Sequence, residues 1–244
     1  MLDLVRASVE NLVTRHDAAY RAKGLTTARD GLLWRGLGNA GLIFLAAITR
    51  RAGADPSLVR RQLGELRERR QGPVWLCDSF RELDLTDAGY KRHDPEPWYV
   101  RQAAPSADDR TPAEFEIRAA ASEEALAEFH RVEWRAFDGP GEAEHGYAPS
   151  LLGDPRFYFY LGSVEREAVA VATVVIADGV VGFYGVGTLP EARGRGYASA
   201  LMQRALSLSP SLPAVLQPSP MAESMYRRLG FDEIGKFQRW STPE

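Results

Sequence analysis

Residues 180–199 of this 244-residue chain read VVGFYGVGTLPEARGRGYAS. The apolar run Val180–Leu189 has the composition of a buried strand, and Pro190 marks its end. After an Arg- and Gly-rich segment, apolar side chains recur at helical spacing, at Tyr197, Leu201, Ala205 and Leu208. The stretch therefore predicts a strand that passes through a glycine-containing loop into an amphipathic helix.

The glycine-containing loop, Arg193-Gly194-Arg195-Gly196, predicts an anion site. Glycine has no side chain and lets backbone N–H groups approach a ligand closely. The start of a helix adds unpaired N–H groups and a partial positive charge. We therefore expect a phosphate or diphosphate to bind between Gly194 and Ser199, with the two arginines close by. The pattern does not specify which phosphorylated ligand binds.

The rest of the C-terminal half predicts a mixed α/β domain with an antiparallel centre. Asp178-Gly179 separates two strand-like runs and is a strong signal for a hairpin turn. Ser122, followed by two glutamates, is typical of the start of a helix. We expect strands at 115–118, 157–164, 168–177, 180–189, 214–216 and 231–240, and helices at 122–136, 197–208 and 221–229.

Two stretches of this half resemble the GCN5-related N-acetyltransferase (GNAT) superfamily. The family's acyl-CoA motif, Gln/Arg-x-x-Gly-x-Gly/Ala, fits Arg193, Gly196 and Ala198. Residues 216–231, LQPSPMAESMYRRLGF, resemble its last conserved stretch. The resemblance covers about residues 113–244 and implies the family's fold, an α/β (α+β) domain with a mixed, mostly antiparallel sheet flanked by helices.

The resemblance also implies acetyl-CoA as the acyl donor. Backbone groups beside a bulge in the strand would bond the pantetheine arm much as an added strand would, and the loop amides would hold the diphosphate. Many family members carry an asparagine where this chain has Ser219, a smaller side chain that makes a poorer bridge to the cofactor. No cluster of metal-ligand residues occurs at suitable spacing, so no metal is expected. The expected cofactor contacts are Val186, Gly187, Thr188, Arg193, Gly194, Arg195, Gly196, Tyr197, Ala198, Ser199 and Ser219.

The implied reaction is direct attack of a neutral amine on the thioester. A backbone N–H near Val186 would stabilise the oxyanion. Tyr226 occupies the family position of the residue that donates a proton to the departing sulfur, whose thiol has a pKa of about 8.5. The alternative is a core position, because Tyr226 shares a helical face with Ala222 and Leu229.

The sequence leaves the general base open. An alkylamine, with a pKa of about 10.4, must lose a proton before it attacks, whereas an arylamine needs no base. The usual strand position for a glutamate is taken here by residues 182–185 (GFYG). Residues in or after the first helix of the domain are candidates, although each is also explained as surface charge: Glu133, Asp138, Glu142, Glu144 and His145.

Residues 1–104 predict a separate, helix-rich domain, joined by a linker at 105–112 to a GNAT domain at 113–244. Helices are expected at 2–22 and 27–51, and a third helix would bury Val59, Leu63 and Leu66. The small-residue segment 36–41 (GLGNAG) lacks the preceding strand of a dinucleotide fingerprint, and we interpret it as a helix packed against a neighbour.

The end of this N-terminal half resembles the end of the chain. Residues 73–101 and 213–242 share the order strand, turn, helix, Gly-aromatic pair and Trp-containing strand. We interpret the half as a degenerate GNAT-like copy without a cofactor loop, and an unrelated helical cap is the alternative. The copy requires residues 74–77 to pair with residues 98–101.

Composition and charge limit the classes of function. The net charge of −3 argues against general affinity for nucleic acid, which needs a cationic surface. The single cysteine, Cys77, excludes an internal disulfide, and no apolar stretch is long enough to cross a membrane. We expect a cytoplasmic monomer or homodimer that acts on a small-molecule or peptide amine and binds neither nucleic acid nor membrane.

Two other functions fit parts of the sequence. Ser219 and the missing strand glutamate would also suit a non-catalytic acyl-CoA-binding sensor or regulatory module. Arg60, Arg67 and Arg70 would suit an interaction protein with a basic surface, although interleaved glutamates favour an ordinary solvated helix face.

Overall fold

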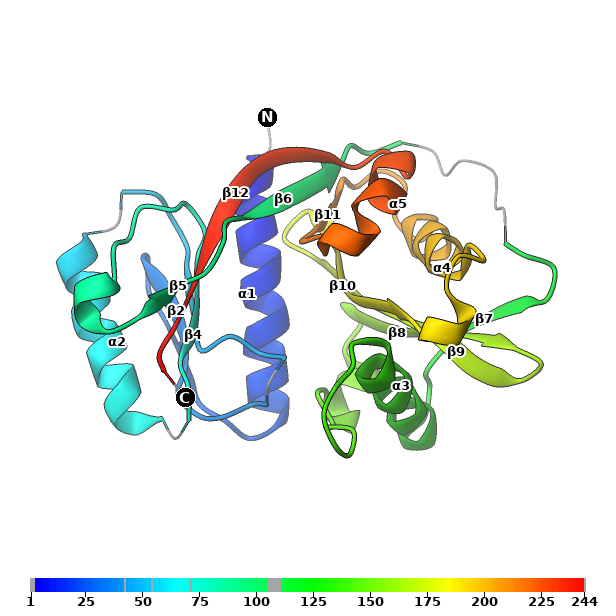
Figure 1. Ribbon diagram of the computed structural model, residues 1–244, viewed down its shortest axis with the longest axis horizontal. Coiled ribbons are helices and arrows are strands. Elements are labelled where there is room, and N and C mark those ends of the chain that lie inside the picture. The colour runs from blue at the N-terminus through cyan, green and yellow to red at the C-terminus, as the bar shows by residue number, and fades with distance from the viewer. Residues whose placement is uncertain (1–2, 42, 54, 71, 105–110, 244) are drawn as a thin grey trace. The chain divides into compact units, whose positions relative to one another are not determined.

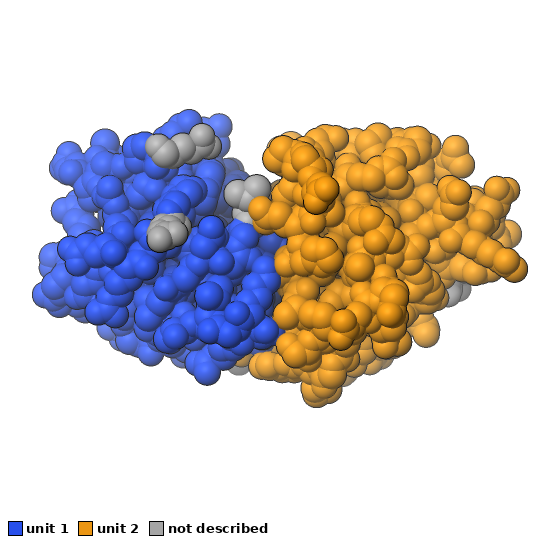
Figure 2. Space-filling model, turned by 90° about the horizontal axis from the view of Figure 1, so that it is seen from below, with its two compact units in different colours: residues 1–99, 233–244 blue, residues 100–232 orange. Residues whose placement is uncertain are grey.

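The computed structural model describes residues 3–41, 43–53, 55–70, 72–104 and 111–243. The chain divides into two compact units, which Figure 2 shows in different colours. Unit 1 comprises residues 1–99 and 233–244, and unit 2 comprises residues 100–232. Most of the predicted linker, residues 105–110, lies outside the described residues.

The sheet of unit 2 is mixed and mostly antiparallel, as predicted (Figure 1). Neighbouring strands from β7 to β10 pair antiparallel, and β10 pairs with β11 in parallel. Asp178 (φ 55°) and Gly179 (φ 76°) form the predicted hairpin turn, in which both central residues have positive φ. The strands are β7 (Phe115–Ala119), β8 (Phe157–Val164), β9 (Glu167–Ala177), β10 (Val180–Thr188) and β11 (Ala214–Leu216).

The helices of unit 2 cover both faces of this sheet, with α3 on one face and α4 and α5 on the other (Figure 1). The predicted cap is confirmed, because the Ser122 hydroxyl accepts a hydrogen bond from the Ala125 N–H at 3.2 Å. The apolar stripe from Leu126 to Ala136 is buried. These elements are α3 (Glu123–Ala136), α4 (Tyr197–Leu206) and α5 (Glu223–Arg228), with 3₁₀ turns η2 (Pro149–Gly153), η3 (Pro190–Ala192) and η4 (Pro220–Ala222).

The described residues of unit 1 form two α-helices and a second sheet. The predicted helices at its start and around Val59–Leu66 are confirmed. The strand order runs β1, β2, β3, β4, β12 and β6, with the short strand β5 paired to β12. The elements are α1 (Leu4–Ala22), β1 (Thr27–Arg29), β2 (Leu33–Gly36), β3 (Ala47–Thr49), α2 (Pro56–Arg69), β4 (Trp75–Asp78), η1 (Thr86–Ala88), β5 (Lys91–Arg92), β6 (Glu96–Arg101) and β12 (Asp232–Ser241).

The prediction of a helix at 27–51 is wrong, because this segment forms β1, β2 and β3. The Asp30 carboxylate accepts hydrogen bonds from the N–H groups of Leu32 and Leu33, at 2.7 and 2.9 Å, and so makes a turn between β1 and β2. Gly36 ends β2 instead of packing a helix. A Cβ at Gly36 would lie 2.1 Å from the Tyr20 ring, so glycine is required for the close approach of α1.

The last strand, β12, belongs to unit 1, although the sequence placed residues 113–244 in one domain. Its residues 238–241 pair antiparallel with β4. The predicted pairing of residues 74–77 with 98–101 is wrong, since β12 lies between β4 and β6 in the strand order. Buried side chains hold β12 in this position in the sheet. The rings of Phe237 and Trp98, for example, have centroids 4.8 Å apart.

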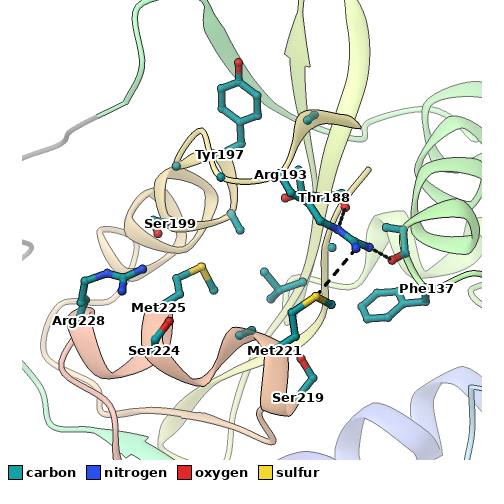
Figure 3. Close-up of a pocket in the computed structure, with 18 residues that line it drawn as sticks. Phe137, Thr188, Arg193, Tyr197, Ser199, Ser219, Met221, Ser224, Met225 and Arg228 are labelled. Carbon is teal, nitrogen blue, oxygen red and sulfur yellow. Dashed lines mark hydrogen bonds between the residues drawn. The ribbon is translucent and has the colours of Figure 1, made fainter. Parts of the chain in front are cut away.

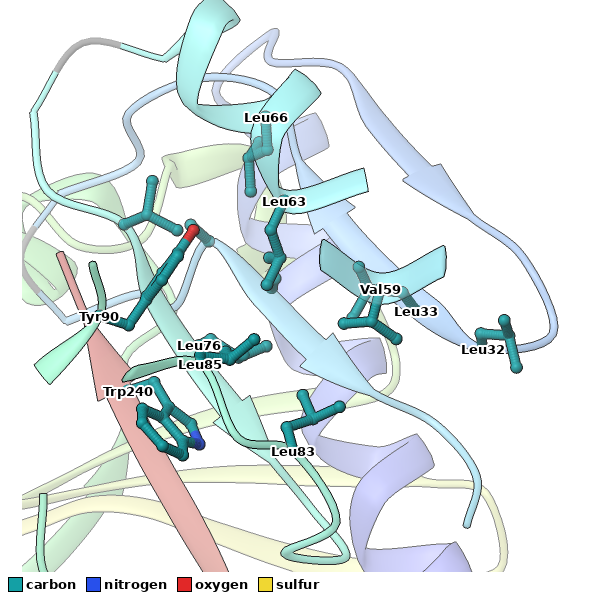
Figure 4. Packing of buried hydrophobic residues seen from close by; sticks show 13 residues of the cluster. Leu32, Leu33, Val59, Leu63, Leu66, Leu76, Leu83, Leu85, Tyr90 and Trp240 are labelled. Atoms are coloured by element: carbon teal, nitrogen blue, oxygen red, sulfur yellow. The ribbon is translucent and has the colours of Figure 1, made fainter. Parts of the chain in front are cut away.

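The core of unit 1 contains Trp240 of β12 (Figure 4). Trp240 is 1% exposed and belongs to the same cluster as Leu63 and Leu66 of α2 and Leu76 of β4. Residues between 32 and 90 therefore share one core with a residue from the end of the chain.

The arginines that would suit a basic interaction surface are used within unit 1. Arg60 and Arg67 donate to the carbonyls of Asp84 and Ala88. Arg70 donates to the carbonyl of Gly38 and to the Tyr20 hydroxyl. These contacts hold α2 against the segments around Gly38 and Asp84–Ala88 of the same unit. No helix among the described residues has the length and apolar character needed to span a bilayer.

Replacing Trp240 by alanine is expected to lower the free energy of unfolding by about 3–5 kcal/mol, because it removes a fully buried aromatic side chain. Urea unfolding would measure the loss, and hydrogen exchange would show β3 and β4 losing protection before β8 and β9. Leu208→Ala is the control, since Leu208 is 38% exposed. Equal loss of protection in both sheets would contradict the assignment of β12 to unit 1.

Candidate active site

A bulge in β10 opens one side of the strand. Tyr184 pairs with Thr173 and Gly187 with Val171, so two residues of β10 face a single residue of β9. Only Val181 to Phe183 pair with β11. Beyond Phe183, the backbone of β10 as far as Thr188 is not paired with β11. The bulge implied by the family resemblance is therefore present.

Helix α3 packs closely on this bulge. A Cβ at Gly185 would lie 2.1 Å from Oε1 of Glu133, and a Cβ at Gly187 would lie 2.8 Å from the Ala136 Cβ. Gly185 also has a positive φ of 54°. Both positions therefore require glycine, and Glu133 is held against the strand with only 8% of its surface exposed.

A pocket of about 620 Å³ lies beside the open part of β10 (Figure 3). Ten of the eleven predicted cofactor contacts line it, and only Arg195, which is exposed, does not. The predicted residues therefore form the side of the pocket made by β10 and the start of α4, together with Ser219 from the side made by η4 and α5. The lining residues that were not predicted come from the end of α3, η3 and the η4–α5 segment: Ala136, Phe137, Ala192, Met221, Ala222, Ser224, Met225 and Arg228.

The loop before α4 has the properties of an anion cradle. Gly194 and Gly196 have φ values of 80° and 86°, and a Cβ on Gly194 would meet nothing within 4 Å. Gly196 is the N-cap of α4, and no side chain caps this helix start. The first N–H groups of α4 have no intrahelical acceptor, so they and the glycine amides fit a diphosphate.

Tyr197 fixes the start of α4 from the other side. Its ring stacks on Phe115 with centroids 4.3 Å apart, and its hydroxyl donates to Glu114 at 3.1 Å. The side chain is 1% exposed. The ring of Tyr197 therefore anchors the helix, and the backbone N–H of Tyr197 is the group that is suited to bind a ligand.

Arg193 has a different role from the one predicted from its charge. Its guanidinium donates to the carbonyls of Thr188, at 3.1 Å, and Ala136, at 2.9 Å (Figure 3). A third contact reaches Met221 Sδ at 3.9 Å. Arg193 therefore joins the ends of β10 and α3 at the pocket. Arg228 of α5 is a further cation in the pocket lining.

Tyr226 is buried, 5% exposed, and is not among the residues that line the pocket. Its ring contacts Phe231 with centroids 6.1 Å apart. Burial raises the pKa of Tyr226 to about 12, so the phenol stays protonated at neutral pH. Met221, Met225 and Arg228 follow helical spacing toward the pocket, whereas Tyr226 lies on the adjacent face of α5.

The five candidate bases differ sharply in their surroundings. Asp138, Glu142, Glu144 and His145 are exposed, and Glu133 is the buried one that contacts β10. The sequence did not single out His130. It is buried in α3, and its Nε2 accepts a hydrogen bond from the Tyr147 N–H at 3.1 Å. Among the described residues, no group of three or more His, Cys, Asp or Glu is placed to hold a metal ion.

Comparison with known proteins identifies this arrangement. The sequence model of the acetyltransferase (GNAT) family matches residues 123–231. Residues 123–231 therefore form a domain that matches the GNAT family. GNAT proteins use acetyl-CoA as the acyl donor, and the pocket beside β10 lies within the matched residues. No curated protein matches the chain in sequence.

Solved structures share this fold over nearly the whole chain. A GCN5-related N-acetyltransferase from Kribbella flavida superposes with a TM-score of 0.70 at 21% identity, covering 97% of this chain and 96% of its own. A GCN5-related N-acetyltransferase from Sphaerobacter thermophilus gives 0.59 at 14% identity, covering 95% and 91%. A functionally unknown conserved protein from Staphylococcus epidermidis gives 0.65 at 14% identity, covering 88% and 92%. These identities establish the fold alone.

Replacing Gly185 by alanine is expected to lower the free energy of unfolding by about 2–3 kcal/mol, because alanine disfavours positive φ and its Cβ displaces the Glu133 carboxylate. A double-mutant cycle with Glu133→Ala, measured by urea unfolding, should recover at least about 1 kcal/mol. Gly141→Ala is the control, since Gly141 has φ 66° and open space around it. Strict additivity of Gly185→Ala and Glu133→Ala would show that the two residues do not press on each other.

Proposed function

We propose that this protein is an N-acetyltransferase that moves an acetyl group from acetyl-CoA to an amine of a small molecule or peptide. The observation that carries the proposal is the juxtaposition, in one pocket, of the bulged strand β10 and the glycine cradle that starts α4. The matched family supports acyl-CoA-dependent acetyl transfer as the general chemistry.

The residues present suit each part of the donor. Amides between Gly194 and Ser199 would hold the diphosphate, because they combine positive-φ glycines with a helix start that no side chain caps. Backbone groups from Val186 to Thr188 would bond the amides of the pantetheine arm, since β11 does not pair with them. Ser219 and Ser224 offer hydroxyls from the opposite wall.

The bound thioester would supply an activated acyl group, and the chain would orient and polarise it. The N–H of Val186, next to the bulge, would donate to the acyl oxygen as negative charge develops there. This donor is fixed in advance, because α3 and β9 hold the bulge from both sides. No reorganisation is then needed during the reaction.

The family resemblance supports a role for the Tyr226 hydroxyl, which would assist the leaving sulfur as a hydrogen-bond donor from the face of α5 next to the pocket lining. Burial raises the pKa of Tyr226 to about 12, whereas a thiol has a pKa of about 8.5. Complete proton transfer from the phenol to a thiolate would therefore be uphill by about 5 kcal/mol. A hydrogen bond to the sulfur avoids this cost and still stabilises the developing charge.

Acetyl-CoA is expected to bind the wild-type protein with heat measurable by calorimetry, and Gly196→Ala should weaken binding at least about tenfold. Alanine disfavours the φ of 86° that turns the amides toward the ligand. Gly89→Ala is the matched control, because Gly89 has φ 76° and lies in unit 1. Absence of heat from wild-type protein at millimolar acetyl-CoA would refute the proposed function.

Replacing Tyr226 by phenylalanine should lower kcat by about 10–100-fold and leave the Kd for acetyl-CoA unchanged, because the hydroxyl acts only as charge develops on sulfur. Release of free thiol with a panel of amines would measure turnover. The raised pKa also means that wild-type kcat should show no fall below pH 10 from titration of Tyr226. Tyr90→Phe in unit 1 is the control.

Unchanged turnover in Tyr226→Phe would remove that residue from the mechanism. Tight acetyl-CoA binding without thiol release for any amine would instead favour the sensor or regulatory module.

A further inference from the structure

Two large apolar side chains at the pocket are exposed to water. Among the described residues, the exposed large hydrophobic side chains are those of Phe137 (55%), Met221 (73%) and Leu208 (38%). Phe137 and Met221 both line the pocket beside β10, and Leu208 does not. A single exposed apolar side chain needs no explanation, whereas apolar side chains that gather at a cavity are typical of a binding site. The pocket therefore presents an apolar surface on which a ligand can be bound.

The fold leaves the ring of Phe137 uncovered. Phe137 is the C-cap of α3, where the helix ends. The turn that follows packs on Trp134, because a Cβ at Gly139 would lie 2.3 Å from the Trp134 ring and Trp134 Nε1 donates to the Pro140 carbonyl at 3.2 Å. The Phe137 ring approaches β10, with its Cε2 atom 3.1 Å from a Cβ built on Gly187. The ring therefore contacts the strand on one side and remains open to the pocket.

Arg193 holds Met221 at the same end of the pocket as Phe137 (Figure 3). One nitrogen of the Arg193 guanidinium donates to the carbonyl of Ala136, the residue before Phe137, at 2.9 Å. Another contacts Met221 Sδ at 3.9 Å. Arg193 thus positions one apolar side chain from the end of α3 and one from η4. A methionine adapts its shape to an apolar ligand and makes favourable contacts with aromatic rings.

The rest of the lining offers an acceptor few polar contacts. Among the described residues that line the pocket, none is Asp, Glu or His. The charged residues of this lining are Arg193, which donates to two carbonyls, and Arg228. The donor would use the backbone of residues 186–188 and the amides of the loop before α4, and these hydrogen bonds do not involve the ring of Phe137. The two apolar side chains are therefore available to the acceptor.

We propose that Phe137 and Met221 select a small acceptor that carries an apolar group close to its amine. The inference rests on the proposed function, which places the acyl carbon beside the N–H of Val186. An amine that attacks this carbon must come within about 3–3.5 Å of it, and Phe137 lies against Gly187, the next residue of β10. The group attached to the nitrogen then contacts the Phe137 ring, with Met221 on the other wall. An apolar group is stabilised there by leaving water, whereas a hydroxyl would lose hydration without gaining a partner.

A pair of small amines tests this preference in the wild-type protein. The amino groups of 2-phenylethylamine and ethanolamine have similar basicity, and the two molecules differ in whether the attached group is apolar or hydroxylated. Release of free thiol from acetyl-CoA reports turnover. We expect kcat/KM for 2-phenylethylamine to exceed kcat/KM for ethanolamine at least about 30-fold.

Phe137→Ala should remove most of the preference. For 2-phenylethylamine, kcat/KM should fall at least about tenfold through a higher KM with unchanged kcat, because the ring contacts the bound amine and the transition state alike. For ethanolamine, kcat/KM should change less than about threefold. Phe137→Leu, which keeps an apolar side chain, should retain part of the preference.

Two substitutions at Met221 separate apolar contact from the contact with Arg193. Met221→Ala should lower kcat/KM for 2-phenylethylamine by about 3–10-fold, because it removes apolar surface. Met221→Leu, which lacks the sulfur but stays apolar, should match wild type. Leu208→Ala is the control, because Leu208 is exposed and does not line the pocket.

Three results would overturn the inference: a wild-type protein that binds acetyl-CoA but does not favour 2-phenylethylamine, equal losses with both amines in Phe137→Ala, or no loss with either. Calorimetry should give equal Kd values for acetyl-CoA with wild type and Phe137→Ala. A weaker Kd in the variant would assign the ring to the pantetheine arm and would also overturn the inference. Wild-type protein that binds no acetyl-CoA would instead refute the proposed function. The two failures are therefore distinguishable.

Discussion

The bulge in β10 is the constraint on which the site depends. Two residues of β10 opposite one residue of β9 shift the register, and pairing with β11 ends at Phe183. A regular strand would continue to use its backbone groups within the sheet, and none would remain for a ligand. The extra residue thus converts the end of a buried strand into a binding edge that leads into the loop before α4. The pocket follows from this change in register.

Glycines serve this site in two opposite ways. At 185 and 187 they allow α3 to approach the strand, and added Cβ atoms would lie 2.1 Å and 2.8 Å from α3 side-chain atoms. At position 194, glycine lies beside open space, because nothing lies within 4 Å of an added Cβ. Gly185 and Gly187 make the bulge rigid, whereas Gly194 leaves backbone amides accessible to an anion. A count of glycines in the sequence does not separate these roles, because they depend on what lies opposite each residue.

Local signals explain what could be predicted from the sequence. Asp178-Gly179 dictates its own turn, Ser122 caps its own helix, and the Arg193–Ala198 motif forms one pocket wall. Prediction failed where the deciding partner is distant in the chain. The segment 27–51 became strands because Asp30 makes a turn and Tyr20 packs on Gly36. The motif likewise predicted that Arg193 lies at the pocket. It did not predict that the guanidinium donates to two carbonyls.

The end of the chain shows why residues 113–244 do not form one separable module. The family match ends at Phe231 and unit 2 ends at Asp232, so the recognised domain stops where β12 begins. Phe231 packs on Tyr226 and Phe183 within unit 2, and the strand that follows is buried in unit 1 through Phe237 and Trp240. A fragment lacking residues 1–104 would expose both aromatic side chains and leave β12 without β4. The likeness of solved structures over nearly the whole chain fits this dependence, because unit 1 supplies the partner strand that the end of the chain requires.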